Sequence, residues 1–60
     1  MPYRTYYLEY MDYNGHFKVY RYQLNNHIIE YSKFQTALKA KARLLKSKKA
    51  KSVEIKEIYY

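Results

Sequence analysis

Tyrosine rings and positively charged side chains are the groups in this chain that could recognise a ligand. Ten of the 60 residues are tyrosine, and 12 Lys and Arg stand against 5 Asp and Glu, for a formal net charge of +7. A tyrosine ring offers a flat face on which a nucleic-acid base can stack, and Lys and Arg can contact phosphates. The composition therefore favours a binding protein whose partner is polyanionic or presents a flat patch.

The residue types that carry out catalysis are sparse and poorly placed. The chain has no cysteine, and its two histidines, His16 and His27, adjoin different turns, so the sequence predicts neither a metal site nor a bound cofactor. Glu54 and Glu57 fall on opposite sides of a strand and do not form an acid and base pair. Ser32 is a helix cap before it is a nucleophile. We therefore expect a protein that is not an enzyme.

Length and composition indicate one small intracellular domain spanning residues 1–60. A chain this short buries only about 60% of its unfolded surface, so its core is thin. The absence of cysteine fits a reducing cytoplasm, and no apolar run approaches the roughly 20 residues that cross a bilayer. Abundant Lys, Tyr, Ile and Asn indicate low-GC coding sequence, so we expect a cytoplasmic protein of a Gram-positive bacterium, a phage or another mobile element.

Two segments rich in β-forming residues flank a turn signal. Residues 3–11 and 17–24 alternate in character, and Asn14-Gly15 between them is a dipeptide that tight hairpin turns favour. Residues 27–31 follow a weaker Asn-Asn turn and add an optional short third strand. The first half of the chain is therefore predicted to form a hairpin with a further strand beside it.

A helix is predicted after these strands. Ser32 and Gln35 have the spacing of a capping box, and residues 33–49 are rich in strong helix formers. At about 100° per residue, the apolar side chains fall on one face and basic ones on another. The apolar face holds Phe34, Leu38, Ala42 and Leu45, and the basic stripe holds Lys39, Arg43 and Lys46. The apolar face and Leu8 are expected to form the core.

Residues 52–59 predict a last strand, which completes the order β-β-(β)-α-β. The expected class is α+β, with a small, mostly antiparallel sheet and one helix packed on one face. A right-handed crossover through the helix would place the last strand beside the first and parallel to it, in the order 3-2-1-4. One helix covers one face, so the other face of the sheet is left open to water or to a partner.

The open face is the candidate binding surface. Because Leu8 is expected to point into the core, Tyr7 and Met11 point away from the helix. A two-residue turn, which we favour, adds Tyr20 and Tyr22 to this face and pairs Lys18 with Met11. A three-residue loop with a bulge at Gly15 would shift the register by one residue and instead turn outward a different set. That set is Phe17, Val19 and Arg21.

The order of hairpin, third strand and the segment from Phe34 to Ala42 resembles the N-terminal arm-type DNA-binding domain of tyrosine recombinases. In that family, from conjugative transposons and phages, a Phe-x-Thr segment enters an Ala-rich helix behind a three-stranded sheet. The resemblance covers residues 4–45. It implies that the face opposite the helix would lie in the major groove of DNA. The residues implicated in this way are Tyr7, Lys18, Tyr20 and Tyr22.

The sequence thus predicts a nucleic-acid-binding protein that uses this open sheet face. The expected contacts are Tyr7, Met11, Lys18, Tyr20 and Tyr22, with Lys39, Arg43 and Lys46 as a secondary basic stripe on a different side. An alternative is a small inhibitor or adaptor that binds a host protein through the same aromatic face, or a homodimer formed there, since tyrosine is enriched in interface cores. A third interpretation needs no ligand, because tyrosine is simply a good strand residue.

Overall fold

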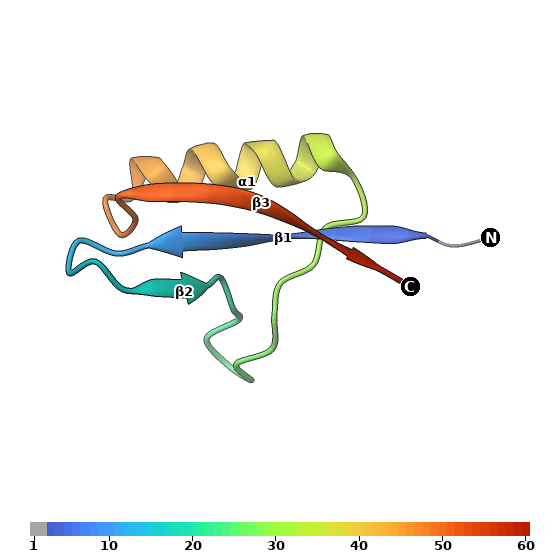
Figure 1. The fold of residues 1–60 in the computed structure, drawn as a ribbon, viewed down its shortest axis with the longest axis horizontal. Coiled ribbons are helices and arrows are strands. Elements are labelled where there is room, and N and C mark those ends of the chain that lie inside the picture. The colour runs from blue at the N-terminus through green and yellow to red at the C-terminus, as the bar shows by residue number, and fades with distance from the viewer. Residues whose placement is uncertain (1–2) are drawn as a thin grey trace.

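A three-stranded antiparallel sheet with one helix on one face makes up the fold (Figure 1). The computed structural model describes residues 3–60. Its elements are β1 Arg4–Met11, β2 Phe17–Val19, α1 Phe34–Lys46 and β3 Ser52–Tyr59. The long strand β1 is central, in the order β2-β1-β3. The predicted α+β class, with a mostly antiparallel sheet and a single helix on one face, is confirmed.

The optional third strand over residues 27–31 is not formed, because this segment joins the sheet only through isolated bridges. After β2 the chain makes a loop, in which the Tyr22 amide donates to the His27 carbonyl at 2.9 Å. The chain then returns to the same edge of β1, where Tyr31 and Tyr6 exchange backbone hydrogen bonds of 2.7 and 2.8 Å. Tyr31 therefore pairs antiparallel with β1 on the same edge as β2, and it does not begin a new strand beyond β2.

This return explains why β3 lies beside β1 as predicted but runs antiparallel to it, which corrects the expected parallel crossover. The eight residues of β3 pair with β1 from Arg4↔Tyr59 to Met11↔Ser52. Tyr31 leaves the sheet near the start of β1. The helix then runs in the same direction as β1, and β3 returns in the opposite direction beside it (Figure 1). The crossover rule applies to parallel strands and does not govern this connection.

The hairpin adopts the three-residue loop with a bulge, so the register that we favoured from the sequence is wrong. Met11 pairs with Phe17, and Glu9 pairs with Val19. Gly15 has a φ of 86° and its amide donates to the Asp12 carbonyl at 3.1 Å, whereas no positive φ occurs at Asn14. A type I turn followed by a left-handed glycine has this geometry, and the residue it inserts moves every side chain of β2 to the opposite face.

The core lies between the sheet and a helix face that differs from the predicted one. Leu8 is fully buried, as expected, and it clusters with Leu44, Ala50 and Val53. Partly buried Tyr10, Tyr20, Tyr31, Ala40 and Ile55 pack around this cluster.

The apolar stripe assigned to the core is largely exposed. Phe34 is 48%, Leu38 44% and Leu45 38% exposed, and Ala42 is exposed as well. Ala37 and Leu44 are the buried positions of α1, and they lie about 100° around the helix from the predicted stripe. The prediction that Phe34, Leu38 and Leu45 form the heart of the core is therefore wrong.

The ends of α1 are set by its flanking residues. The N-cap is Lys33, and no side-chain hydrogen bond caps the helix there, so the predicted capping box of Ser32 and Gln35 is not formed. At the other end the Ser47 hydroxyl donates to the Leu44 carbonyl at 2.6 Å, and Lys48 takes a left-handed φ of 61°. Within residues 3–60, no helix has the length and apolar character needed to cross a membrane.

Candidate functional site

The open face of the sheet carries the side chains that alternate with the core positions. Directly opposite residues of an antiparallel ladder share a face, so Tyr7 and Met11 lie on this face as predicted. Phe17 and Val19 join them through the bulged register. Arg21, the third residue expected with them, lies beyond the end of β2 and is among the residues that line the groove described below. Side chains alternate between the two faces along a strand, so Lys18, Tyr20 and Tyr22 lie on the helix side. The prediction that these three share a face with Tyr7 and Met11 is therefore wrong.

The charges on the open face are mainly negative. Glu9 lies directly opposite Glu54, and Glu30 accepts a 2.6 Å hydrogen bond from the Thr5 hydroxyl at the end of the same face. Lys56, on the same face, is engaged by Glu54 at 3.1 Å. That hydrogen bond raises the pKa of the Lys56 ammonium, and the charge of Glu9 adds to the effect. This face therefore presents carboxylates where a phosphate backbone would need cations.

An open groove of about 1100 Å³ lies on the helix side, between the C-terminal half of α1 and the segment from β2 through the following loop. Tyr10, Tyr20 and Tyr22 contribute aromatic rings to it. The ring centroids of Tyr10 and Tyr20 are 6.5 Å apart in an edge-to-face arrangement, and both rings pack on the core. Tyr22 is 52% exposed, so its ring is accessible to a ligand.

Cations line both walls of this groove. Lys18 and Arg21 come from the strand side, and Arg43 and Lys49 come from the helix and the turn after it. The guanidinium of Arg21 donates to the Asn26 carbonyl at 3.0 Å, which ties the loop back to the sheet. Residues 33–51, which contain α1 and the turn after it, include no Asp or Glu, so positive charge predominates along this wall.

The basic stripe predicted on the helix is exposed at all three positions, Lys39, Arg43 and Lys46. Only Arg43 lines the groove. Because Arg43 shares the groove with Lys18, Tyr20 and Tyr22, the expectation that the stripe lies apart from the candidate sheet residues is wrong for Arg43. The structure thus brings together four of the eight predicted site residues, and it leaves Tyr7 and Met11 on the opposite face of the sheet.

Sequence reasoning missed several groove residues. Tyr10 and Lys49 line the groove, but they were not among the binding residues predicted from the sequence. The loop residues Asn25 and Asn26 were assigned only to a turn. Correct hairpin register would have found Tyr10, because it shares a face with Lys18, its cross-strand neighbour.

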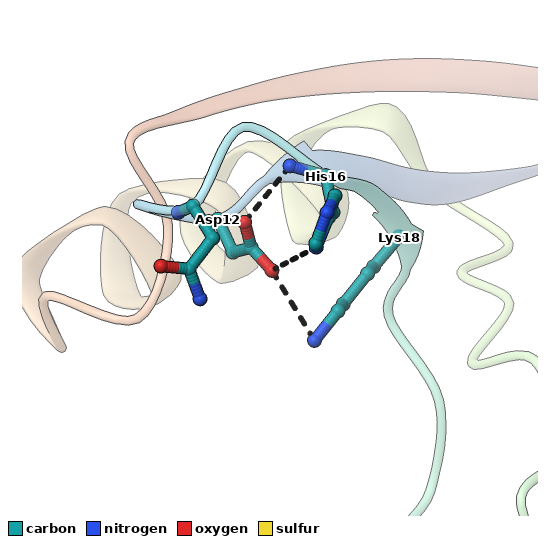
Figure 2. Close-up of polar contacts among 4 residues, drawn as sticks. Asp12, His16 and Lys18 are labelled. Atoms are coloured by element: carbon teal, nitrogen blue, oxygen red, sulfur yellow. Dashed lines mark hydrogen bonds and ion pairs between the residues drawn. The ribbon is translucent and has the colours of Figure 1, made fainter.

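The hairpin turn positions Lys18 at the end of the groove. Figure 2 shows the Asp12 carboxylate at the centre of this turn. Its Oδ1 accepts 2.9 Å hydrogen bonds from the Asn14 and His16 amides, and its Oδ2 lies 3.3 Å from Lys18 Nζ. The His16 amide lowers the pKa of the Asp12 carboxyl below its usual range, and Lys18 and Asn14 lower it further. Ionised Asp12 therefore stabilises the bulged turn.

We predict that Asp12→Asn reduces the acid sensitivity of the fold. A lowered folded-state pKa means that Asp12 contributes stability above its ordinary pKa, and that this contribution is lost as pH falls through the folded-state value. The variant should be less stable than the wild type at neutral pH, and the two should converge in acid. Urea unfolding followed by circular dichroism across this range measures the difference. His16→Ala, which keeps the donating amide, should retain the acid dependence of the wild type; equal acid dependence in Asp12→Asn and wild type would contradict the prediction.

The fold and site together describe a small α+β domain with an aromatic, basic groove. Comparisons with protein-family models, curated proteins and solved structures found no match. Within residues 3–60, no group of three His, Cys, Asp or Glu side chains is placed to hold a metal ion. The function therefore has to be inferred from the chain's own residues.

Proposed function

We propose that this protein binds single-stranded nucleic acid in the groove between α1 and the β2 side of the sheet. The observation that carries this proposal is the joint lining of the groove by tyrosine rings and by cations from both walls. Known proteins that bind single strands combine a positively charged groove with aromatic side chains on which bases stack.

The aromatic part of the groove supports recognition of unpaired bases. The edge-to-face packing of Tyr10 and Tyr20 holds these rings in place, while Tyr22 presents an exposed ring beside them. A base stacks on such a ring only when it is free of its own helix, and base–aromatic stacking contributes about 1 to 3 kcal/mol per base. A concave surface also suits a single strand better than a duplex, whose grooves accept a protruding helix or ribbon.

The distribution of charge supports the groove over the open sheet face. Arg43 and Lys49 stand on one wall, and Arg21 stands on the other with Lys18, which is itself paired with Asp12. A strand between the walls would therefore have cations within reach of its phosphates on both sides. The open face instead offers Glu9 and Glu54, with Lys56 engaged by Glu54. A polyanion would be repelled there and attracted to the helix side.

Tyr22→Ala and Tyr7→Ala form a matched pair of variants that separates the two surfaces. Binding of a fluorescently labelled oligothymidylate is measured by anisotropy at low salt. Tyr22→Ala is expected to weaken binding by about 1 to 3 kcal/mol, because it removes a stacking ring from the groove. Tyr7→Ala, which removes a ring from the open face, should leave the affinity unchanged.

Salt dependence provides a second readout of the same site. Arg43→Gln should lower the slope of log affinity against log salt by about one, since it removes one phosphate contact. Lys56→Gln should leave the slope unchanged, because Lys56 lies on the open face. If Tyr7→Ala weakens binding while Tyr22→Ala does not, the sheet face is the site. If no oligonucleotide binds at low salt, the proposal is wrong, and the alternative of an inhibitor or adaptor that binds a host protein is the next one to test.

A further inference from the structure

The outer edge of β3 is a free sheet edge. β3 pairs with β1 along its whole length, and no other segment among residues 3–60 pairs with its far side. The Tyr60 amide donates to the Tyr3 carbonyl at 2.9 Å, so by the alternation of an antiparallel ladder the even-numbered residues face β1. Val53, Ile55 and Glu57 therefore present backbone donors and acceptors at the open edge. Long unpaired edges of this kind are templates for pairing with another strand.

The charges along this edge are complementary to themselves. In the sequence Glu54-Ile55-Lys56, a two-fold axis at Ile55 would place Glu54 of each copy opposite Lys56 of the other. Both side chains lie on the open face of the sheet, because Glu54 is opposite Glu9 and Lys56 is opposite Tyr7. Opposite charges directly across an antiparallel ladder stabilise the pairing, and like charges oppose it.

The exposed apolar stripe of α1 lies on the same side of the molecule as this edge. Arg43 and Ser47 line the groove on the β2 side of the helix, and the stripe occupies the other flank, about 140 to 180° away around the helix. Leu38 and Leu45 of this stripe are 44% and 38% exposed. Leu44 belongs to the same cluster as Val53, and Ile55 packs against that cluster, so the C-terminal end of the stripe, at Leu45, is level with the first half of β3.

Strand spacing brings two such helices into packing distance. The helix packs on both β1 and β3, which places it over this strand pair. If the helix axis lies above the middle of the β1–β3 pair, it is half a strand spacing from β3. The two-fold axis would lie half a spacing beyond β3, so the helix axis and the two-fold axis are about one strand spacing, roughly 4.8 Å, apart. Two helices related by that axis would be about 10 Å apart, within reach of ordinary helix–helix packing. Both helices would lie on the same face of a six-stranded sheet.

We propose that two copies of this chain associate through antiparallel pairing of their β3 edges about a two-fold axis at Ile55, with the exposed leucines of their helices in contact. This interface is isologous and closed, so it ends the sheet at two copies. A standard interface of about 800 Å² per partner would cover roughly one sixth of the 5002 Å² surface of the chain. The nucleic-acid groove is on the other flank of the helix and stays open, so the dimer stands independently of the proposed function.

Charge-swap variants test this interface by sedimentation equilibrium over a wide range of concentrations. The wild type is expected to form dimers. Glu54→Lys and Lys56→Glu each place like charges opposite one another twice and should weaken dimerisation at least tenfold. The double variant E54K/K56E restores both pairs and should dimerise as the wild type does. Helical circular dichroism of each variant, recorded at a dilution where the chain is monomeric, checks that the fold is retained.

Glu57→Pro tests the strand pairing itself. The Glu57 amide faces the free edge and is not needed by β1, so proline is tolerated there in the monomer but removes a donor from the interface. We expect loss of the dimer with helical content retained, and zero-length carbodiimide coupling of Glu54 to Lys56 should yield a covalent dimer only in the wild type and E54K/K56E. A wild type that stays monomeric at millimolar concentration overturns the proposal. So does a dimer that persists unchanged in Glu54→Lys or Glu57→Pro.

Discussion

Replacing Leu8 with alanine is expected to remove a large part of the stability of the protein. Leu8 is fully buried at the centre of the sheet, where it is opposite Ile55 and beneath Leu44. Removing a buried leucine side chain costs about 2 to 5 kcal/mol. A domain of this length has a total stability of only about 3 to 9 kcal/mol. Thermal melting and urea unfolding, followed by circular dichroism, measure the loss.

Leu24→Ala is the matched control for this variant. It makes the same chemical change at a position that is fully exposed in the loop after β2. Its melting temperature should equal that of the wild type, because no buried area is lost. A Leu8→Ala variant that melts together with Leu24→Ala would show that the core does not form around Leu8.

The sequence located β1, α1 and β3 because their signals are local. The strand expected over residues 17–24 is limited to Phe17–Val19, and the one over residues 27–31 is not formed. Alternation located β1 and β3, helix formers located α1, and the scarcity of glycine made the turn at Gly15 stand out. The hairpin register was mistaken because Asn-Gly was read alone. Asp12, two residues earlier, binds the turn amides with its side chain and favours the longer loop, in which only Gly15 needs a positive φ.

The rotation of the helix was mistaken for a different reason. The larger apolar side chains of this helix, Phe34, Leu38 and Leu45, fall on one stripe, and periodicity therefore favours that stripe as the buried one. The buried positions are instead Ala37 and Leu44, and the small side chain of Ala37 lets the helix approach a sheet whose inner face carries tyrosine rings. The periodicity of the helix does not show which of its faces is buried, because that depends on which rings of β1 and β2 point inward.

The candidate site inherited both errors. The residues were selected as types that can stack on bases and contact phosphates, and the shift in register carried Lys18, Tyr20 and Tyr22 across the sheet. Rotation of the helix then placed Arg43 beside them at the groove. The four residues meet only in the folded chain, so spacing along the sequence could not have grouped them.

Leu44→Ala and Leu45→Ala are expected to differ sharply although they are neighbours in the sequence. Leu44 is 4% exposed in the core, and Leu45 is 38% exposed on the opposite flank from the groove. Leu44→Ala should lower the free energy of unfolding by about 2 to 5 kcal/mol. Leu45→Ala should change it by less than about 1 kcal/mol in the monomer.

The comparison isolates the rotation of the helix, because both variants remove the same atoms and change helix propensity equally. Urea unfolding at a protein concentration where only the monomer is populated keeps any contact of Leu45 with a second chain out of the measurement. A larger loss for Leu45→Ala than for Leu44→Ala would place the stripe of Phe34, Leu38 and Leu45 in the core after all. Arg43 would then turn away from the groove, and the proposed nucleic-acid site and the helix contact of the dimer would be wrong with it.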